Sequence, residues 1–398
     1  MLVDEATFPM DISSDDGSVG REKISLLVDC GAIKVGGGVQ LALNFINFFR
    51  KYPSHIGKVF FLVPKGGILA SRGNFECDEA VIECPDGYFG RKWFELFFLR
   101  CFIRKHDIRA VFTFFGAGLP VGKNVFSVVC VAYPIICYAD SSYWGFIPRR
   151  RRLRTRVVNY LRIRRIRRAS VVVAETDVMA NRLASVLKIA RDNVVVSPPV
   201  PSAFVRPVER TRGTGDQGVR LLVLSGLDPH KNLWRLPSMA LEMEALGFDA
   251  FTFVVSVDRG TFETAYPAVR DSAAVLDRRF RFVGSIPPDR IQEVYDDSDF
   301  LVNISDLESF SNNYIEAWKA GLPLICSRRD FAVHICGASA VYVEPHDPVA
   351  SASAMIRVIR DRALQESMII EGAARLRALP LLEEKFVGIL NLVRREGA

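Results

Sequence analysis

A chain of 398 residues, 49% of them hydrophobic and with a formal net charge of +7, is long enough for two domains with separate cores. No window of about 18 or more residues is apolar and uncharged, so we expect no transmembrane helix. The eight cysteines include no Cys-x-x-Cys pair and the five histidines are dispersed, which excludes a recognisable metal-ligand pattern and favours reduced thiols in a cytosolic enzyme.

The first half of the chain predicts an α/β domain. Residues 1–20 lack the basic start and apolar core of a signal peptide, so we expect a disordered lead-in. From residue 21 to 200, short apolar stretches alternate with helical ones. We expect strands at residues 24–28, 59–63, 110–115, 125–131 and 170–174, and a helix over residues 39–50. This alternation is typical of a doubly wound parallel sheet.

Three consecutive glycines, Gly36, Gly37 and Gly38, follow the first predicted strand. Without a Cβ atom, they let the backbone approach a ligand closely. They do not match the GxGxxG fingerprint of dinucleotide-binding proteins, and a flexible turn is the other interpretation.

A strongly basic segment lies between residues 148 and 168, where eleven arginines account for much of the positive charge. They include the run Arg149, Arg150, Arg151 and Arg152, and apolar residues are interleaved with them. This pattern predicts a basic amphipathic helix whose arginines face an anionic membrane. A solvated helix face with a packing role is the alternative. A nucleic-acid site is a weaker one, because we find no recognised motif or stacking platform beside the segment.

A lysine follows the first strand of the second half. Residues 221–224 predict that strand, Ser225 and Gly226 a tight turn, and Lys231 and Asn232 the start of a helix. A lysine at a strand-to-helix turn places a cation where phosphate oxygens would lie. Taken alone, such a lysine is more often a solvated loop residue.

Two glutamates stand eight positions apart, Glu308 and Glu316. A predicted strand over residues 299–305 precedes them, and residues 311–313 can cap a helix over residues 314–320. The loop therefore lies at the carboxyl edge of a parallel sheet, where open α/β sheets bind ligands, and the helix start favours phosphate. Carboxylates beside an anion site are explained if they accept hydrogen bonds from sugar and ribose hydroxyls, as in a nucleotide-sugar. Chance spacing, with Glu316 merely favoured by the helix dipole, is the alternative.

Together these segments carry a resemblance. Lys231 and Asn232, then Phe282-Val-Gly284 with a helix over residues 288–295, and then the Glu-x7-Glu pattern resemble the carboxyl-terminal half of family 4 glycosyltransferases. The order and spacing agree over roughly 150 residues, the length of one domain. The resemblance implies an α/β chain of the GT-B fold, with two Rossmann-like, doubly wound parallel-sheet domains that face a central cleft.

The domain boundaries follow from composition and from this resemblance. Residues 201–218 are rich in proline, glycine and charge, which predicts a linker. The N-terminal domain, residues 21–200, would bind the acceptor, and the C-terminal domain, residues 219–380, the nucleotide-sugar donor. Residues 381–398 predict an amphipathic helix, which in this fold crosses back to the N-terminal domain.

The resemblance assigns roles to individual residues. Lys231 would bind the donor diphosphate, Glu308 would face the hydroxyls of the transferred sugar, and Glu316 would accept hydrogen bonds from the ribose. Lys231 and Glu308 are thus the catalytic candidates. The further donor-binding candidates are Gly37, Gly38, Ser225, Gly226, Asn232, Gly284, Phe310, Ser311 and Asn312.

The sequence departs from the common family pattern at several positions. Gly226 stands where many members have an arginine, so the second diphosphate cation is unassigned, with His230 and Arg235 as candidates. Ser309 and Ser311 replace glycines. No histidine occupies the position near the transferred sugar, where residues 115–120 lie instead. The Asp-Ser-Asp triplet at 297–299 resembles a metal-binding motif, but we expect it to cap a strand, and we expect no metal or cofactor.

The expected function is that of a retaining, hexosyltransferase-like enzyme that moves a sugar from a UDP-, GDP- or ADP-sugar to a glycan or lipid-linked acceptor. The expected context is bacterial cell-surface polysaccharide or lipopolysaccharide assembly. We expect a cytoplasmic protein, peripheral on the inner face of the cytoplasmic membrane, and no nucleic-acid partner. A GT-B-like module that binds nucleotide-sugar or polysaccharide without transferring it is the alternative.

Overall fold

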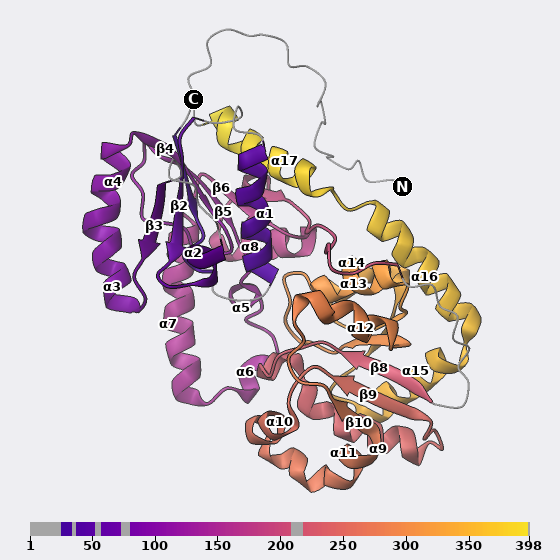
Figure 1. Ribbon diagram of the computed structural model, residues 1–398. Helices are drawn as coiled ribbons and strands as arrows, with labels where there is room; N and C mark the ends of the chain where they lie inside the picture. The colour runs from indigo at the N-terminus through magenta and orange to yellow at the C-terminus, as the bar shows by residue number, and fades with distance from the viewer. Residues whose placement is uncertain (1–24, 34–36, 52–56, 73–79, 208–217, 397–398) are drawn as a thin grey trace.

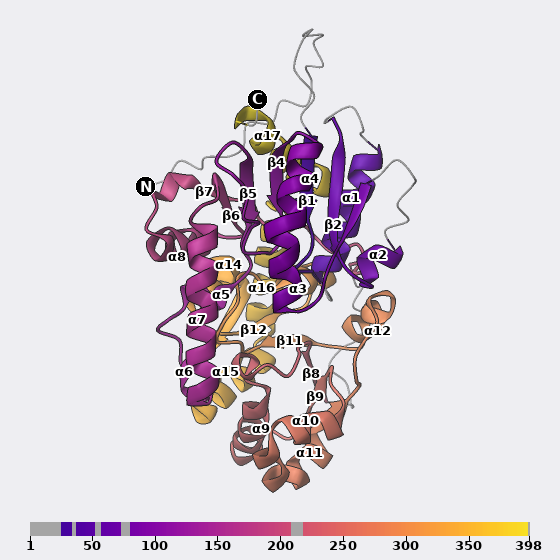
Figure 2. The same cartoon turned by 90° about the vertical axis from the view of Figure 1, so that its left-hand side faces the viewer.

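The computed structural model describes residues 25–33, 37–51, 57–72, 80–207 and 218–396. The predicted lead-in at residues 1–20, Gly36, Cys77 and most of the predicted linker lie outside these described residues. The described chain forms two domains, each built on one parallel sheet, as Figures 1 and 2 show. This confirms the predicted fold class.

The N-terminal sheet has seven strands in the order β3-β2-β1-β4-β5-β6-β7, all paired in parallel. The strands are β1 (Ser25–Asp29), β2 (Val59–Pro64), β3 (Ala80–Cys84), β4 (Ile108–Thr113), β5 (Phe126–Cys130), β6 (Val171–Ala174) and β7 (Val194–Val196). Both faces of the central strands are covered, which is why their middles are unbroken apolar runs such as Leu26–Val28.

Helices cover this sheet on both faces (Figure 2). They are α1 (Gly37–Lys51), α2 (Ile68–Arg72), α3 (Tyr88–Trp93), a π-helical turn η2 (Phe94–Phe98), α4 (Leu99–Lys105), α5 (Pro134–Cys137), α6 (Tyr143–Phe146), α7 (Arg149–Ile166) and α8 (Asp177–Leu187). The predicted basic segment is thus helical over most of its length. Among the described residues, no helix combines the length and apolar character that a membrane crossing requires.

The C-terminal sheet has six strands in the order β10-β9-β8-β11-β12-β13. They are β8 (Val219–Val223), β9 (Phe251–Val255), β10 (Phe280–Phe282), β11 (Phe300–Asn303), β12 (Leu324–Ser327) and β13 (Ala340–Val343). The main helices are α9 (Leu236–Ala245), α10 (Arg259–Ala265), α11 (Ala273–Arg279), α12 (Ile291–Asp296), α13 (Asn312–Ala320), α14 (Asp330–Cys336), α15 (Pro348–Arg360) and α16 (Arg362–Arg377). The strand order reverses between β8 and β11, and this switch point is where ligands enter doubly wound sheets.

The last helix, α17 (Leu382–Glu396), leaves the C-terminal domain and lies on the N-terminal one (Figure 1). Its Phe386 is fully buried, with ring centroids 4.7 Å from Phe45 and 5.4 Å from Phe48 of α1. Its Lys385 is also buried and donates hydrogen bonds to the carbonyls of Ser197 and Pro198. The chain end therefore completes the core of the domain in which the chain began.

Replacing Phe386 with Ala should lower the free energy of unfolding by about 3–5 kcal/mol, because the buried ring leaves a cavity among other phenylalanines. Urea unfolding followed by circular dichroism measures this loss. Phe89→Ala makes the same chemical change at a side chain that is 79% exposed, and it should change the value by no more than about 0.5 kcal/mol. Equal effects of the two substitutions would contradict the packing role of α17.

Candidate functional site

The predicted loop that contains Glu308 joins β11 to α13 at the carboxyl edge of the C-terminal sheet. Ser311 is the N-cap residue of α13, but its side chain does not cap the helix as the sequence predicts. Instead, Ser311 Oγ accepts a hydrogen bond from Asn303 Nδ2 at 2.9 Å, which ties the end of the loop to the end of the strand. The side chain of Ser311 thus leaves the first N–H groups of α13 to other partners, and such groups favour anions.

Lys231 reaches this loop from a different kind of turn than expected. The prediction that a helix starts at Lys231 is wrong, because α9 begins only at Leu236. Two short 3₁₀ turns precede α9, and between them Asn232 adopts a left-handed conformation with φ 58°. Asn232 is fully buried and donates a hydrogen bond from Nδ2 to the carbonyl of Ile304 at 3.0 Å. Asparagine tolerates this conformation better than most residues, and it breaks the helix where the site needs a turn.

The turn brings together the two predicted catalytic candidates. Lys231 Nζ lies 2.5 Å from Glu308 Oε1, and the two side chains are only 23% and 11% exposed. A partly buried ion pair is less screened by water and salt than a surface pair. Lys231 and Glu308 therefore form a preorganised charge pair beside the start of α13.

Glu316 lies on α13 in a partly buried position. Its Oε2 accepts a hydrogen bond from the hydroxyl of Tyr295 at 2.8 Å. Burial raises the pKa of Glu316, although hydrogen bonds from Tyr295 and Ser202 partly offset the effect. In its ionised form this carboxylate has acceptor capacity left for a second hydroxyl donor.

The remaining predicted residues of this domain follow strands of the same sheet. Ser225 follows β8, and its N–H binds Ser256 Oγ at 3.0 Å. Gly284 follows β10 with φ 71°, a conformation that favours glycine. Gly226 has open space around the position of a Cβ atom, so no packing requires glycine there. The carboxyl edge of the sheet thus gathers these residues with the loop that contains Phe310.

The two predicted glycines of the N-terminal domain begin α1, which starts at Gly37 rather than after the glycines. Because α1 follows β1, its start lies at the carboxyl edge of the N-terminal sheet. A Cβ atom on Gly38 would lie 3.4 Å from the side chain of Ile33 and 3.5 Å from that of Phe115, at the close end of ordinary van der Waals contact. Their part in ligand binding stays a prediction.

A hydrogen bond between the domains reaches the middle of the loop. Ser309 Oγ donates to Glu175 Oε2 at 2.8 Å, and both residues are buried. Burial raises the pKa of Glu175, while the charge of Lys385 and the hydrogen bond from Ser309 act against that rise. Our sequence reasoning missed Glu175, and its only signal was a carboxylate directly after the apolar strand β6. The serine that departs from the family pattern is thus a contact between domains.

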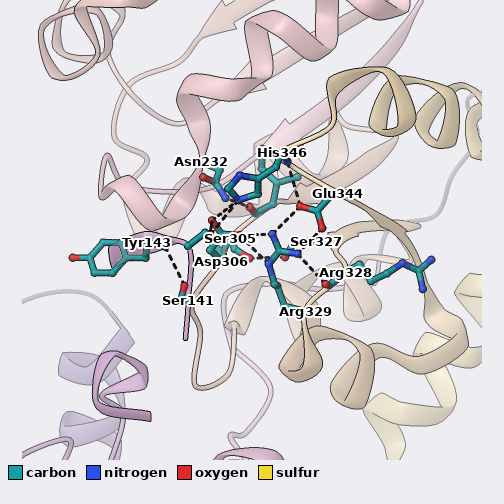
Figure 3. A network of polar contacts seen from close by, with 12 residues as sticks. Ser141, Tyr143, Asn232, Ser305, Asp306, Ser327, Arg328, Arg329, Glu344 and His346 are labelled. Carbon is teal, nitrogen blue, oxygen red and sulfur yellow. Dashed lines mark hydrogen bonds and ion pairs between the residues drawn. The ribbon is translucent and has the colours of Figure 1, made fainter. Parts of the chain in front are cut away.

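A second polar network lies beside the loop (Figure 3). Asp306 accepts hydrogen bonds from Arg329 at 2.7 Å and from Ser142 Oγ of the N-terminal domain at 3.0 Å. Burial opposes ionisation of Asp306, but hydrogen bonds from Asn232 and Arg329 outweigh it and hold the pKa of Asp306 below its usual value. Arg329 also pairs with Glu344 at 2.8 Å. Of these residues, only Asn232 stood out in the sequence.

His346 extends this network toward the N-terminal domain. Arg235 donates to His346 Nδ1 at 2.8 Å, so Nε2 carries the hydrogen that points to Asp306 Oδ2 at 3.2 Å. A cavity of about 380 Å³ opens beside it between the domains. Its lining includes Tyr138, Ser142 and Arg182 from the N-terminal domain and Asp306, Arg328 and His346 from the C-terminal one.

The surroundings of His230 and Arg235 argue against either of them as the second cation. Burial, together with the nearby charge of Lys231, lowers the pKa of His230, so its ring is uncharged at neutral pH. Arg235 binds His346 and stacks over Trp234 at 4.0 Å. A second diphosphate cation is therefore not assigned.

The Asp-Ser-Asp triplet has structural partners. Asp299 accepts a hydrogen bond from the backbone N–H of Arg220 at 2.8 Å, and Asp297 pairs with Arg281 at 2.7 Å. Across the part of the chain that the structure describes, no cluster of three or more His, Cys, Asp or Glu side chains is arranged to hold a metal ion.

The chain is similar to known glycosyltransferases in two respects, in the sequence of part of its C-terminal domain and in its fold. Residues 244–361, which include both glutamates, match a family model described as "Glycosyl transferases group 1". No curated protein sequence matches the chain. Solved structures match over nearly the whole length at low identity, which shows a shared fold. The fold is therefore the GT-B fold of glycosyltransferases, as the sequence predicts.

Three such structures illustrate the likeness. A glycosyltransferase from Rickettsia africae is 16% identical, with 95% of this chain and 99% of that chain covered and a TM-score of 0.69. Anabaena HepE in complex with UDP and glucose is 14% identical, with 94% and 99% covered and a TM-score of 0.63. WaaG, a glycosyltransferase involved in lipopolysaccharide biosynthesis, is 15% identical, with 93% and 99% covered and a TM-score of 0.66.

The low pKa of Asp306 has a consequence for stability. Its folded-state pKa lies below the unfolded value, so Asp306 contributes stability at neutral pH that is lost as the pH falls through the folded-state pKa. Asp306→Asn should cost about 2–4 kcal/mol near neutral pH, and the difference from wild type should shrink in acid. Urea unfolding at a series of pH values measures both effects.

Asp107→Asn is the matched control, because Asp107 pairs with Arg109 on the surface, where its side chain is 79% exposed. This change should cost less than about 1 kcal/mol at any pH. A cost for Asp306→Asn no larger than that for Asp107→Asn would show that the network contributes no stability.

Proposed function

We propose that this protein is a retaining glycosyltransferase that uses a nucleotide diphosphate sugar as donor. The observation that carries the proposal is the charge pair of Lys231 and Glu308, 2.5 Å apart at the start of α13 and at the switch point of the C-terminal sheet. The match of residues 244–361 to the group 1 glycosyltransferase model supports it. The likeness to Anabaena HepE, solved with UDP and glucose, favours a UDP-sugar.

The donor would lie across the carboxyl edge of the C-terminal sheet. Its diphosphate would bind Lys231 and the N–H groups at the start of α13, which carry about half a positive charge. Glu316 would accept hydrogen bonds from the ribose, and Glu308 from hydroxyls of the transferred sugar. In the free protein Glu308 is the partner of Lys231, so the arriving diphosphate would exchange one anionic partner of Lys231 for another.

Catalysis would depend on stabilising the leaving group. Negative charge grows on the diphosphate oxygens as the anomeric bond breaks, so Lys231 would interact more strongly with the transition state than with the bound donor. Retention would proceed by attack of an acceptor hydroxyl on the face from which the nucleotide leaves. The new bond to the anomeric carbon forms as its bond to the diphosphate oxygen breaks, and the hydroxyl proton passes to the departing diphosphate. Once the diphosphate has taken its place at Lys231, Glu308 would be free to bind the sugar, and we assign it to that role because attack from the leaving-group face needs no enzyme nucleophile.

The acceptor would be a glycan or a lipid-linked glycan, and the context the assembly of a bacterial surface polysaccharide or lipopolysaccharide. The likeness to WaaG, which takes part in lipopolysaccharide biosynthesis, favours this class. The basic helix α7, with Arg149–Arg152 at its start, favours a site at an anionic membrane surface. The protein would then work in the cytoplasm, peripheral on the inner face of the membrane.

One observation favours a second candidate function. Gly226 supplies no cation, the ring of His230 is uncharged at neutral pH, and Arg235 binds His346, so Lys231 has no assigned helper for the diphosphate. A module that binds nucleotide-sugar or polysaccharide without transferring sugar would tolerate this lack. Nucleotide release from a panel of UDP-, GDP- and ADP-sugars with glycan acceptors separates the two functions, because only the transferase releases nucleotide with acceptor-dependent kinetics.

Lys231→Ala should weaken nucleotide diphosphate binding by about 10- to 100-fold, the value of a hydrogen bond to a charged group. Thermal shift against UDP, GDP and ADP measures it, since a ligand that binds only the native state raises its apparent stability. Lys123→Ala, at an exposed lysine of the N-terminal domain, is the control and should bind as the wild type does. Wild-type affinity in Lys231→Ala would refute the assignment.

The raised pKa of Glu316 predicts a pH dependence. The ionised carboxylate is the form that accepts two hydroxyl hydrogen bonds, so nucleotide affinity should be full above this pKa and fall as the pH drops through it. Because the pKa is raised, the fall should begin at a higher pH than for an ordinary glutamate. Isothermal titration of UDP at a series of pH values measures it.

Glu316→Gln keeps the shape of the side chain but cannot ionise. Its nucleotide affinity should be lower than that of wild type near neutral pH and should not show this fall in acid. Identical pH profiles for the two proteins would contradict the role of Glu316 at the ribose.

A further inference from the structure

An unusual group of apolar side chains lies exposed on the run α3–η2–α4 of the N-terminal domain. Phe89 is 79% exposed, Trp93 66%, Leu96 48%, Phe97 57% and Phe98 48%. We call these five residues the aromatic face. Single exposed apolar residues are common on soluble proteins, but a contiguous group of this kind marks an interaction surface.

Between Phe89 and Phe98, the polarity of this run is inverted relative to a helix in water. Its one carboxylate, Glu95, is 2% exposed and points into the protein, whereas the aromatic rings point out. Inside, Glu95 binds Arg91 of the same run at 3.2 Å and Arg165 of α7. These arginines compensate the buried charge of Glu95 and so hold this side of the helix against the protein. The aromatic rings on the other side therefore face the solvent.

The exposed rings are ordered rather than splayed. Trp93 and Phe97 stack with centroids 4.6 Å apart, and Phe94 and Phe98 stack at 5.0 Å. Phe94 and Phe98 are the first and last residues of the π-helical turn η2, and Trp93 directly precedes it. A π-helical turn shifts the side chains around the helix axis within the run. The stacked rings make the aromatic face an ordered apolar surface.

The basic helix α7 lies next to the aromatic face. The contact of Arg165 with Glu95 joins the two elements, and Figure 2 shows α3 and α7 running along the same face of the molecule. Exposed apolar side chains continue on α7, where Leu153 is 66% and Tyr160 61% exposed among the arginines. The face thus combines apolar rings with a high density of positive charge.

We propose that the aromatic face and α7 together form a membrane-docking surface, on which the rings enter the boundary between headgroups and acyl chains of an anionic bilayer and the arginines contact lipid phosphates. Aromatic rings prefer this boundary, and basic residues are attracted to anionic lipid. A second copy of the chain fits less well, because two such faces would bring their arginines together.

This surface deepens the proposed function and rests on it in one respect, since a membrane would hold a lipid-linked acceptor. The surface belongs to the N-terminal domain, whereas Lys231, Glu308 and Glu316 belong to the C-terminal one. Docking would therefore place the bilayer against the N-terminal domain, whereas the candidate donor site lies in the C-terminal domain. Lipid binding can be measured without donor or acceptor, so the two proposals can fail separately.

The test is flotation of the full chain with vesicles of phosphatidylglycerol and phosphatidylethanolamine, compared with vesicles of phosphatidylcholine alone. Wild type should float with the anionic vesicles. The double variant Trp93→Ser/Phe97→Ser should partition about tenfold or more weakly, because two large rings no longer leave water. Trp93→Phe keeps an apolar ring and should retain most of the binding.

Ile370→Ser/Val349→Ser is the matched control, because these side chains are 69% and 51% exposed on helices of the C-terminal domain. It should bind vesicles as the wild type does. Replacing Arg149–Arg152 by Gln should weaken binding at low salt more than at high salt, since salt screens the lipid charge. Thermal shift with UDP should be unchanged in Trp93→Ser/Phe97→Ser, which separates loss of docking from loss of the donor site.

Equal flotation of wild type and Trp93→Ser/Phe97→Ser would overturn the proposal. So would self-association of the wild type, seen by sedimentation velocity and abolished by the double variant, without vesicle binding. Binding of single-stranded nucleic acid in place of vesicles, again lost in the double variant, would overturn it too.

Discussion

A buried lysine near the end of the chain links the returning helix α17 to the segment where the chain leaves the N-terminal domain. Lys385 of α17 donates hydrogen bonds to the carbonyls of Ser197 and Pro198, where the chain leaves the N-terminal domain. Burial lowers the pKa of Lys385, with the nearby Cys130 and Glu175 acting against that shift. An ammonium group in this position needs acceptors, and these carbonyls supply them only when α17 has crossed back. One side chain thus joins the segment by which the chain leaves the N-terminal domain to the helix by which it returns.

This arrangement sets the geometry of the candidate site. With the domains so placed, Glu175 meets Ser309, and Ser142 meets Asp306, so both contacts reach the loop that joins β11 to α13 from the opposite domain. The loop contains Glu308, whose partner Lys231 comes from the β8 side of the same sheet. A change in domain orientation would therefore act on the loop that is proposed to hold the donor.

The two domains present different chemistry to their surroundings. The C-terminal domain gathers the groups suited to a phosphate and to hydroxyls at a sheet edge, in partly buried positions. The N-terminal domain exposes aromatic rings beside an arginine-rich helix, with the one carboxylate of that run turned inward. A transferase that takes a soluble donor and an acceptor in a bilayer needs such a division. Both features are thus accounted for by one proposed function.

The sequence by itself determined the α/β fold and the unit from β11 to β12, because these depend on local patterns of apolar, helix-starting and turn residues. It also named Lys231, Glu308 and Glu316 as candidates, through their spacing and their resemblance to family 4 glycosyltransferases. It missed the left-handed Asn232, which is stabilised by the distant carbonyl of Ile304. It also missed Glu175, Asp306 and the aromatic face. Only the tertiary structure decided these features, because burial and partner choice arise from contacts between residues far apart in the chain, such as Ser309 with Glu175, 134 positions away.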